Sequence, residues 1–579
     1  MRVIVTAGHV DHGKSTLVRR LTGMEPDRWA EERRRGLTID LGFAWTRIGG
    51  EDVAFVDVPG HERFVPNMLA GAGPVPAVLF VVAADEGWMP QSAEHLAALD
   101  AFGVRHGLLV VTKADRADPA AATAVALREI EATSLGAVPS VAVSGITGAG
   151  LDGLRAAIGE LTGGLPPPDP GADLRLWIDR AFTVAGAGTV VTGTLAAGTI
   201  AVGDELELGT ARVKVRGLQA LGAPRDRVGA VARVAVNLRG TARGDVRRGD
   251  VLLTPGRWRA TAGFDVRLRG AAAADLHRDL VLHLGTAAVP VRVRPLGTDT
   301  ARLTTATPLP LRVGDRGLVR DPGEHRIAAG FDVLDVRPPP LSRRGAARAR
   351  ASELEEPDLA RTYLRRNGFV RIEDFAAMGL PETGERLGGW LADPERFAGL
   401  RAEAEELVRG WDSVAAGMPV EALRQRLGLP AAELVVPLLS TGFEVAGGLV
   451  RRPGAGLAPA VEKALETVEK QLAEHPFRAP EADQLRALGL GRKELAAAVR
   501  VGRLTAVAEG VVLGPDVEER AAAELRGLPQ PFTVSEARQA LGSTRRVMIP
   551  LLERLDAAGR TESLGDGTRR ASDGVHKGP

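Results

Sequence analysis

Residues 3–15, VIVTAGHVDHGKS, decide the fold of the N-terminal part of the chain. The apolar run VIVTA predicts a buried β-strand, and the pattern G-x-x-x-x-G-K-[ST] follows it directly. Glycines in such a loop let backbone N–H groups face phosphates, the lysine supplies a point charge, and the serine hydroxyl is placed for Mg²⁺. The nucleotide contacts predicted from this motif are Gly8, His9, Val10, Asp11, His12, Gly13, Lys14, Ser15 and Thr16. By itself, the motif is compatible with both ATP and GTP.

Three further motifs at the ends of apolar runs favour guanine nucleotides. Asp57-Val58-Pro59-Gly60 has the form D-x-x-G, in which the glycine N–H senses the γ-phosphate. In Thr112-Lys113-Ala114-Asp115, the carboxylate of Asp115 is placed to accept hydrogen bonds from guanine N1 and N2. A backbone N–H of Ser144-Gly145 is expected at guanine O6. Together these motifs predict a GTP/GDP site, with Thr112 standing where most GTPases have asparagine.

A Mg²⁺ site and a catalytic residue are predicted from the same region. Ser15, Thr38 in RRRGLTID (33–40) and Asp57, acting through water, are the expected metal-binding residues. Thr38 is expected to join the metal only in the triphosphate state. His61 directly follows D-x-x-G, where translational GTPases have histidine and small signalling GTPases have glutamine. We therefore expect His61 to orient the attacking water.

Composition limits the classes of protein. The 579 residues exceed the size of one core, so several domains are expected. With no cysteine, the chain has no disulfides and no thiolate sites. A formal net charge of +1 identifies no partner. We expect a cytoplasmic protein, because no long apolar stretch and no leader pattern is found.

The pattern of apolar and polar residues changes twice along the chain. Residues 1–168 alternate apolar runs with helical patterns, which is typical of a parallel sheet covered on both faces. Residues 172–256 and 257–338 have short β-type runs broken by Gly-Asp and Pro-Gly turns, and these predict two β-barrels. The stretch PPPLSRRGAARAR (338–350) is interpreted as a linker. Beyond it, LRQRLGL, QLRALGL and ARQALGS recur at intervals of about 55 residues, which is typical of a repeated structural unit.

These repeats predict tandem winged helices. The expected boundaries are 344–410 for a degenerate first copy, 411–457 for the second, 458–518 for the third and 519–575 for the fourth. The overall expectation is a multidomain chain: an α/β P-loop GTPase domain, two β-barrels and four winged helices.

Several stretches resemble a known family. GHVDHGKST, RRRGLTID and DVPGHERF are similar to elongation factor Tu, and RGLTIDLGF, VTKAD and WIDRAFTVAGAGTVVTGTL resemble the bacterial-type selenocysteine-specific elongation factors, the SelB family. The stretch GSTRRVMIPLLERLDAAGRTESLGDGTRR (542–570) looks like the final winged helix of that family. The resemblance implies a monomeric, ribosome-stimulated GTPase. It also implies that the protein carries selenocysteyl-tRNA to the ribosome at UGA codons marked by an mRNA hairpin.

The resemblance also implies two sets of binding residues. Asp179, Arg180 and Arg233 are the expected selenocysteine pocket. A selenolate is largely ionised at neutral pH, whereas a thiol with a pKa near ~8.5 is mostly neutral and serine is always neutral, so cationic arginines would favour the selenolate. The alternative is that these are ordinary surface charges of a barrel strand. The expected RNA contacts in the fourth winged helix are Arg545, Arg546, Arg560, Arg569 and Arg570.

Other functions remain open at this point. Winged helices are often protein–protein modules, and the first three copies are interpreted as spacers. A general elongation or initiation factor would not need the long C-terminal extension. A GTP-switched regulator that binds DNA would carry basic residues on the second helix of every repeat, whereas ELVVPLL and ELAAAV are mostly apolar.

Overall fold

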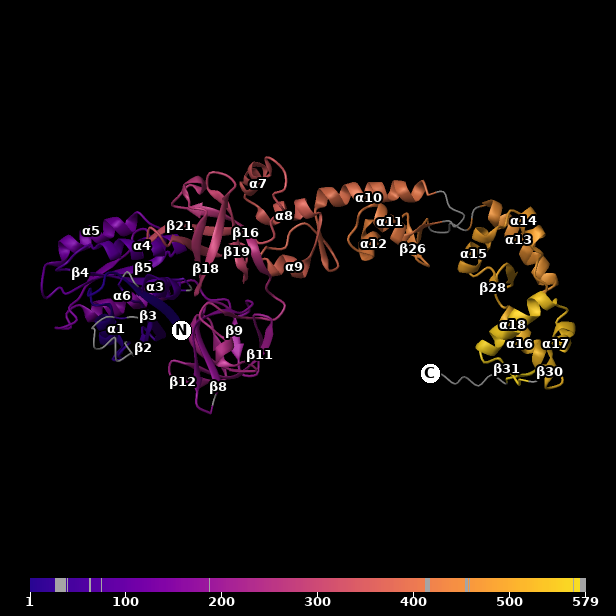
Figure 1. Cartoon of the computed structure of the whole chain (residues 1–579), viewed down its shortest axis with the longest axis horizontal. Helices are drawn as coiled ribbons and strands as arrows, with labels where there is room; N and C mark the ends of the chain where they lie inside the picture. Colours follow the sequence, from indigo (N-terminus) through magenta and orange to yellow (C-terminus); the bar gives the residue numbers. More distant parts are fainter. Residues whose placement is uncertain are drawn as a thin grey trace. The chain divides into compact units, whose positions relative to one another are not determined.

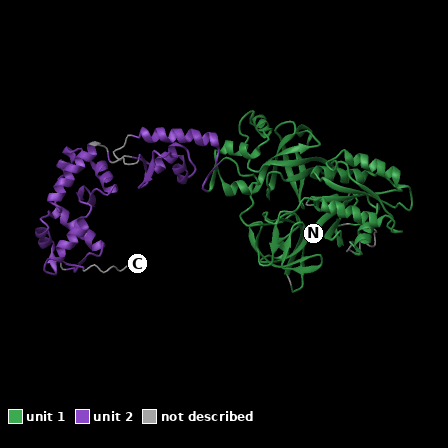
Figure 2. Cartoon of the chain, turned by 180° about the vertical axis from the view of Figure 1, so that it is seen from behind, with its two compact units in different colours: residues 1–384, 389–391 green, residues 385–388, 392–579 purple. Residues whose placement is uncertain are grey.

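The computed structural model describes residues 1–26, 38, 40–61, 64–73, 75–186, 188–411, 417–452, 457, 459–565 and 567–572. Of RRRGLTID, the described residues are Thr38 and Asp40. The chain divides into two compact units, which are coloured separately in Figure 2: residues 1–384 with 389–391, and residues 385–388 with 392–579.

The first domain of unit 1 is the α/β domain coloured indigo to violet in Figure 1. Its sheet has six strands in the order β2-β3-β1-β4-β5-β6. β2 runs antiparallel to β3, and all other neighbours are parallel. The strands are β1 (Arg2–Ala7), β2 (Gly42–Ile48), β3 (Glu51–Asp57), β4 (Ala77–Ala83), β5 (His106–Thr112) and β6 (Ser140–Ala142). The helices are α1 (Lys14–Thr22), α3 (Val65–Ala72), α4 (Pro90–Phe102), α5 (Pro119–Glu131) and α6 (Leu151–Gly163).

Both faces of this sheet are buried. In β1, Val3 and Val5 belong to the core shared with α3, α4 and α5, whereas Ile4 belongs to the core shared with α1 and α6. This burial explains why the strands read as continuous apolar runs. The carboxyl ends of β1, β3 and β5 carry the sequence motifs and lie at one edge of the sheet, which is where open α/β sheets bind ligands.

The second domain, barrel II, is a seven-stranded sheet with the order β10-β15-β7-β8-β14-β11-β12. An additional pairing of β10 with β11 closes six of these strands on themselves. The main strands are β7 (Arg175–Val184), β8 (Gly188–Leu195), β10 (Glu205–Leu208), β11 (Ala211–Ala220), β14 (Ala232–Arg239) and β15 (Val251–Leu253). The short elements are β9 (Thr199–Ala201), β12 (Ala223–Arg225), β13 (Arg227–Gly229) and η2 (Arg243–Asp245).

The third domain, barrel III, is a closed barrel with the order β16-β19-β18-β17-β20-β21. Its elements are β16 (Ala260–Arg269), η3 (Ala273–Asp275), β17 (Asp279–Leu284), β18 (Ala287–Pro295), β19 (Thr300–Pro310), β20 (Arg316–Asp321) and β21 (Arg326–Asp335). Two barrels at these places confirm the expected fold class.

The interpretation of residues 338–350 as a linker is wrong for its second half. Helix α7 (Ala346–Leu354) begins inside it, and Arg350 is buried, with a 3% exposed side chain. The Arg350 guanidinium donates to Asp265 Oδ2 at 2.7 Å and to Asp335 Oδ2 at 2.5 Å, and both aspartates belong to barrel III. The sequence predicts a linker here because Asp265, one of the two acidic partners of Arg350, lies 85 residues away in the sequence.

The degenerate first winged helix packs on barrel III. It contains α8 (Leu359–Asn367), β22 (Phe369–Arg371), α9 (Ile372–Ala377), β23 (Glu385–Leu387) and β24 (Trp390–Ala392). Tyr363 and Phe375 are members of the barrel III core. The first winged helix therefore shares a hydrophobic core with barrel III and stabilises it.

Three further winged helices follow. The second has α10 (Pro394–Arg409), β25 (Met418–Pro419), α11 (Val420–Arg426), η4 (Ala432–Leu434), α12 (Val435–Leu438), β26 (Glu444–Ala446) and β27 (Leu449–Arg451). The third has α13 (Pro459–Glu474), α14 (Ala482–Ala487), α15 (Arg492–Arg500), β28 (Thr505–Ala508) and β29 (Val511–Leu513). The fourth has α16 (Val517–Arg526), β30 (Phe532–Thr533), α17 (Val534–Ala540), α18 (Arg545–Ala557), β31 (Thr561–Ser563) and β32 (Thr568–Ala571).

Contacts between these helices refine the domain boundaries. Helix α10 packs against α11 and α12, so we propose that the second winged helix begins near residue 393 rather than at 411. The third and fourth copies share one continuous apolar core from Leu457 to Leu555. Among the described residues, we find no helix that combines the length and the apolar character needed to cross a membrane.

Candidate functional site: the nucleotide loops and the arginine cluster of barrel II

The predicted phosphate loop joins β1 to α1, and its backbone carbonyl groups bind the side chain of Lys14. Gly8 and Gly13 have φ values of 127° and 82°, which favour glycine. A Cβ atom at Gly8 would lie 2.1 Å from the carbonyl oxygen of Val81, so no larger residue fits there. Lys14 Nζ donates to the carbonyl oxygens of Gly8 at 2.9 Å and His9 at 2.7 Å. Burial lowers the Lys14 pKa to about 8, and an anion bound in the loop would stabilise its charged form.

The three predicted metal-binding residues lie together at the start of α1. Ser15 Oγ donates to Asp57 Oδ2 at 2.6 Å and is 3.0 Å from Thr38 Oγ1. Thr6 Oγ1 holds the other carboxylate oxygen of Asp57 at 2.7 Å. Two hydroxyls and one carboxylate are the hard oxygen ligands that Mg²⁺ prefers, so the residues present fit that ion.

Sequence reasoning missed His95, which supports the phosphate loop from α4. Its Nδ1 accepts a hydrogen bond from the Gly8 N–H at 3.0 Å. Burial lowers its pKa to about 3, so the ring is neutral and Nδ1 is free to accept. The sequence offered no signal, because nothing local distinguishes this histidine from any other residue on the buried side of a helix.

The predicted guanine motifs surround a cavity of about 170 Å³. Asp115, Gly145, Gly13 and Thr16 are among its lining residues. The hydrogen bond from Ser144 is the main reason why the pKa of Asp115 lies below its usual value, so its carboxylate stays an acceptor at neutral pH. This arrangement offers a ligand the ionised carboxylate of Asp115 in the lining of the cavity.

The threonine that replaces the usual asparagine has a structural role. Thr112 Oγ1 donates to the carbonyl oxygen of His12 at 2.7 Å and so ties the guanine loop to the phosphate loop. His12 itself is buried, and that burial lowers its pKa to about 4. The hydroxyl thus stabilises the loop, although its reach is shorter than that of an amide.

His61 follows a glycine that touches the phosphate loop. A Cβ atom at Gly60 would lie 2.5 Å from Lys14 Nζ and 2.6 Å from the Val10 nitrogen. His61 is half-buried, and its ring centroid is 6.0 Å from that of Phe64. The backbone therefore brings His61 next to the end of the loop where a γ-phosphate would lie.

The three residues predicted as an amino-acid pocket also lie together. Arg233 forms a two-pronged ion pair with Asp179, with Nη2–Oδ1 at 2.7 Å, and Thr192 Oγ1 donates to Asp179 Oδ1 at 2.7 Å. Arg180 donates to the carbonyl oxygen of Leu41 and is 2.9 Å from Asp40 Oδ2. Arg180 and Arg233 lie beside a cavity of about 200 Å³.

Two residues of this cluster were missed in the sequence. Arg248 donates to Asn67 Oδ1 at 2.7 Å and is 3.7 Å from Asp40 Oδ1. Burial is the main reason why the pKa of the Arg248 guanidinium lies below its usual value. Phe43 lies beneath the guanidinium groups of Arg180 and Arg233, at 5.1 and 3.7 Å from the ring centroid. We call Arg180, Arg233 and Arg248 the arginine cluster.

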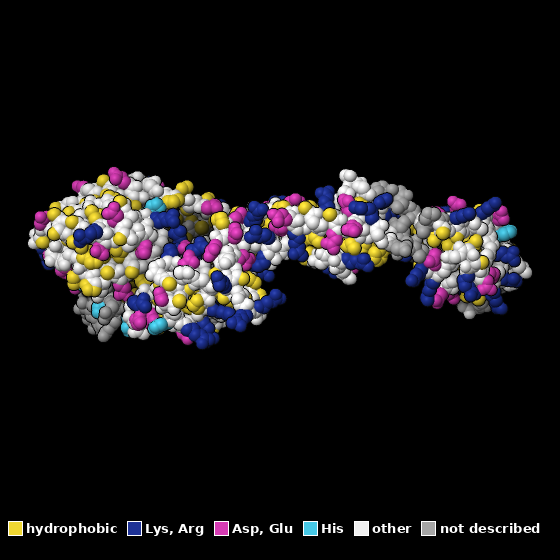
Figure 3. All heavy atoms as spheres, turned by 90° about the horizontal axis from the view of Figure 1, so that it is seen from above, with side chains coloured by type: hydrophobic (Ala, Val, Ile, Leu, Met, Phe, Trp, Pro, Cys, Tyr) yellow, Lys and Arg dark blue, Asp and Glu magenta, His cyan; other side chains and the backbone are white. Residues whose placement is uncertain are grey.

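The five predicted RNA contacts are not equivalent. Arg546 donates to the carbonyl oxygen of Pro480 at 3.0 Å and pairs with Glu481, so it holds the third and fourth winged helices together. Arg569 pairs with Asp556 at 2.9 Å and Arg560 with Glu519 at 3.2 Å. Arg545 and Arg570 are exposed and form no ion pair with any described residue. In Figure 3, basic and acidic side chains are mixed over the face in view at the C-terminal end.

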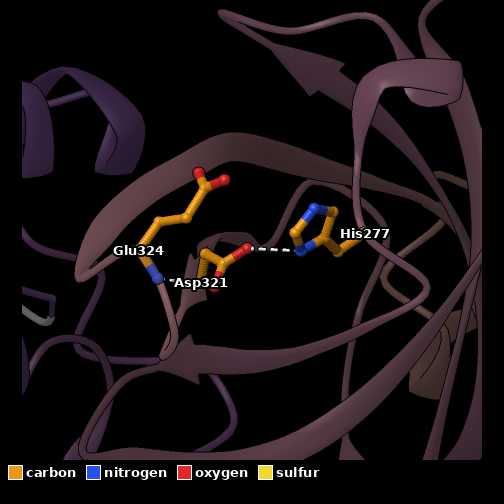
Figure 4. Close-up of side chains that lie close together, drawn as sticks. All are labelled: His277, Asp321 and Glu324. Atoms are coloured by element: carbon orange, nitrogen blue, oxygen red, sulfur yellow. Dashed lines mark hydrogen bonds and ion pairs between the residues drawn. The ribbon is translucent and has the colours of Figure 1, made fainter.

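A histidine–carboxylate cluster in barrel III is satisfied by its own contacts (Figure 4). His277 Nδ1 is 2.8 Å from Asp321 Oδ2. Asp321 Oδ1 accepts the backbone N–H groups of Gly323 and Glu324, and the Glu324 carboxylate pairs with Arg326. We interpret these residues as a capped turn between β20 and β21.

Four family models match the chain. Residues 1–163 match the elongation factor Tu GTP binding domain, and residues 188–253 match elongation factor Tu domain 2. Residues 264–340 match the β-barrel domain of selenocysteine-specific elongation factor, and residues 523–570 match a winged helix of elongation factor SelB. The fold and the nucleotide loops, together with these matches, define a translational GTPase that binds guanine nucleotides.

Individual relatives narrow the class. The chain is 36% identical over 438 residues to the selenocysteine-specific elongation factor of Desulfomicrobium baculatum, covering 69% of this chain and 68% of that protein. It is 38% identical over 390 residues to that of Escherichia coli, covering 65% of this chain and 62% of that protein. The chain belongs to the family of selenocysteine-specific elongation factors. The crystal structure of a bacterial member is similar over 99% of this chain and 100% of that chain, with a TM-score of 0.74 and 25% identity.

Changing Asp115 to Asn is expected to weaken GTP binding by about 10-fold or more, because a charge-assisted hydrogen bond contributes roughly 1.5–3 kcal/mol. Binding of xanthosine triphosphate should improve at the same time, since the asparagine amide can donate to its O2. Titration of both nucleotides measures the two effects. If both nucleotides lose affinity equally, Asp115 supports the loop and does not read the base.

Proposed function

We propose that this protein delivers selenocysteyl-tRNA to the ribosome at UGA codons marked by an mRNA hairpin, and hydrolyses GTP upon correct decoding. The observation that carries the proposal is the arginine cluster between barrel II and the α/β domain. An anionic amino-acid side chain is the ligand that such a cluster would select. We also propose that the protein acts in the cytoplasm as a monomer.

The nucleotide site would work by positioning and charge neutralisation. Ser15, Thr38 and Asp57, the last through water, would hold Mg²⁺, which neutralises charge on the β- and γ-phosphates. Lys14 and the N–H groups of residues 8–16 would bind the phosphates, while Asp115, Ser144 and Gly145 would bind guanine. Thr112 and Lys113 would shape the guanine loop, because Thr112 holds the His12 carbonyl and Lys113 pairs with Glu86 at 2.5 Å.

His61 would orient the water that attacks the γ-phosphate. The packing of Gly60 against Lys14 and Val10 supports this role, because it brings the next residue to the phosphate end of the loop. The ribosome would complete the arrangement and so make hydrolysis depend on decoding.

Charge would distinguish selenocysteine from serine. Of the two carboxylates that pair with the three arginines, Asp179 lies in barrel II with them, whereas Asp40 lies in the α/β domain. Without Asp40, a selenolate would pair with the arginines that Asp179 does not hold, whereas a neutral serine hydroxyl would leave their charge unpaired. Asp179 would orient Arg233, because it holds both guanidinium nitrogens.

The fourth winged helix would bind the hairpin. Arg545, at the start of α18, and Arg570, in β32, are two exposed cations that phosphates could contact. Arg546 and Arg560 would contribute after exchanging their exposed partners Glu481 and Glu519, which costs little because surface ion pairs contribute roughly 0–1 kcal/mol. Arg569 would keep its half-buried partner Asp556 and would lie beside the RNA backbone. The shared core of the third and fourth copies gives this surface a rigid base.

Changing Arg545 and Arg570 together to Glu is expected to weaken hairpin binding and to reduce its salt dependence by about one slope unit per lost phosphate contact. Affinity for a hairpin from a selenoprotein mRNA of the same organism, titrated against salt, measures this. The pair Arg486→Glu and Arg500→Glu on the third winged helix introduces the same charge change and serves as control. Identical salt curves for wild type and the Arg545/Arg570 variant would place RNA recognition elsewhere.

Reconstituted translation tests the whole function. Programmed ribosomes should incorporate selenocysteine at a UGA codon only when the protein, GTP and the downstream hairpin are all present. Equal delivery of an ordinary aminoacyl-tRNA to its own codon would instead favour a general elongation factor.

A further inference from the structure

Asp40 of the α/β domain occupies the arginine cluster. One of its oxygens is 2.9 Å from Arg180 Nη2, and the other is 3.7 Å from Arg248 Nη1. Its side chain is about a quarter exposed, at 27%. A carboxylate is therefore already present where the amino-acid side chain is proposed to bind.

The segment that carries Asp40 also reaches the nucleotide site. Thr38, two residues earlier, has its hydroxyl 3.0 Å from Ser15 Oγ. The carbonyl oxygen of Leu41, one residue later, accepts from Arg180, and the Leu41 side chain is buried in the core of the α/β domain. Thr38 thus lies at the expected Mg²⁺ ligands, while Asp40 and Leu41, two and three residues later, contact the arginines.

A glycine keeps this connection close to the metal-binding carboxylate. A Cβ atom at Gly42 would lie 3.2 Å from Asp57 Cβ and 3.0 Å from Pro26 Cβ. The start of β2 therefore packs tightly against Asp57. A change of contacts at Ser15, Thr38 or Asp57 would therefore shift the position of Asp40, which is only two residues from Thr38.

We propose that Asp40 is a specificity-determining residue that makes recognition of selenocysteine depend on the nucleotide. Its carboxylate competes with the selenolate for Arg180 and Arg248. Thr38 would exchange its contact with Ser15 for the cation that accompanies bound GTP. Asp40 would then withdraw and leave Arg180 and Arg248 to the selenolate. In the GDP state Asp40 stays, and two anions at the same guanidinium groups repel each other. This inference rests on the proposed function, since it assumes that the cluster binds selenocysteine.

Changing Asp40 to Asn tests the inference, because the amide keeps the shape and removes the competing charge. The affinity of full-length protein for selenocysteyl-tRNA in the GDP state should rise about tenfold or more, within the usual range of coupling between two sites. Affinity in the GTP state should change less, so the ratio between the two states should shrink. The same tRNA charged with serine should show no such gain.

Two companion variants keep the test sharp. Asp40→Glu retains the charge and should retain the nucleotide dependence, and Asp152→Asn removes an exposed charge on α6 as a matched control. The inference is overturned if Asp40→Asn leaves the ratio of tRNA affinities in the GTP and GDP states unchanged. It is likewise overturned if the ratio falls only because tRNA affinity in the GTP state falls. It is also overturned if GTP affinity itself falls, because Asp40 would then belong to the nucleotide site. Should wild-type protein bind both charged forms of the tRNA equally, the proposed function fails instead.

Discussion

Replacing His61 with alanine is expected to slow ribosome-stimulated GTP hydrolysis by about 10²-fold or more, the scale of losing a group that positions or activates water. GTP affinity should stay near the wild-type value, because the phosphate cradle around Gly13 and Lys14 is unchanged. Binding of aminoacyl-tRNA should also persist. Single-turnover hydrolysis in the presence of programmed ribosomes measures the effect.

A matched histidine variant separates this role from general damage. His475 is exposed on the third winged helix, so His475→Ala should hydrolyse GTP at the wild-type rate. Unchanged hydrolysis in the His61 variant would remove it from the catalytic step. A parallel loss of GTP affinity would mean that His61 supports the loop instead.

Replacing Arg233 with alanine is expected to lower affinity for selenocysteyl-tRNA by about 10²-fold, since removing one partner of a buried charge pair costs roughly 2–5 kcal/mol. Asp179, whose side chain is 3% exposed, would lose the arginine that offsets its carboxylate, and the site would lose one of the cations that attract a selenolate. Affinity for the same tRNA carrying serine should fall much less, because that side chain is neutral.

The conservative variant Arg233→Lys identifies what the guanidinium contributes. Lysine keeps the charge but cannot form the two-pronged contact with Asp179. It should recover part of the affinity lost in Arg233→Ala. Equal losses for both charged forms of the tRNA, in the Arg233 variants and in Arg180→Ala, would place these arginines against the tRNA body.

The α/β domain could be predicted from the sequence because its signals are local. Gly8, Gly13 and Lys14 follow an apolar run, and a strand, a tight loop and a helix need residues of these kinds in this order. The same holds for the alternating strands of the two barrels. Apolar runs predict the buried strands. The position of each motif directly after such a run predicts that the motifs meet at one edge of the sheet.

The parts that could not be predicted depend on contacts between distant segments. His95 lies 87 residues from Gly8, and its hydrogen bond exists only because α4 packs under the phosphate loop. Arg248 and Asp40 come from different domains and meet only when barrel II lies against β2. Arg350 was interpreted as linker because its partners, Asp265 and Asp335, are set by the barrel.

The partners of the C-terminal arginines could not be predicted from the sequence either. A run of basic residues predicts a surface charge, but the sequence does not reveal which cations are neutralised. Arg546 and Arg569 have fixed partners in the third and fourth winged helices, while Arg545 and Arg570 have none among the described residues. Charge patterns therefore predict a basic surface, and only the structure shows which of its arginines are already paired.

The rate of ester hydrolysis of an aminoacyl-tRNA tests most directly whether the arginine cluster holds selenocysteine. One tRNA is charged with either selenocysteine or serine and incubated with the protein and GTP or GDP. We expect strong protection of the selenocysteine ester with GTP, little protection with GDP, and little protection of the serine ester in either state. Equal protection of the two esters with GTP would contradict selection of an anionic side chain by Arg180, Arg233 and Arg248.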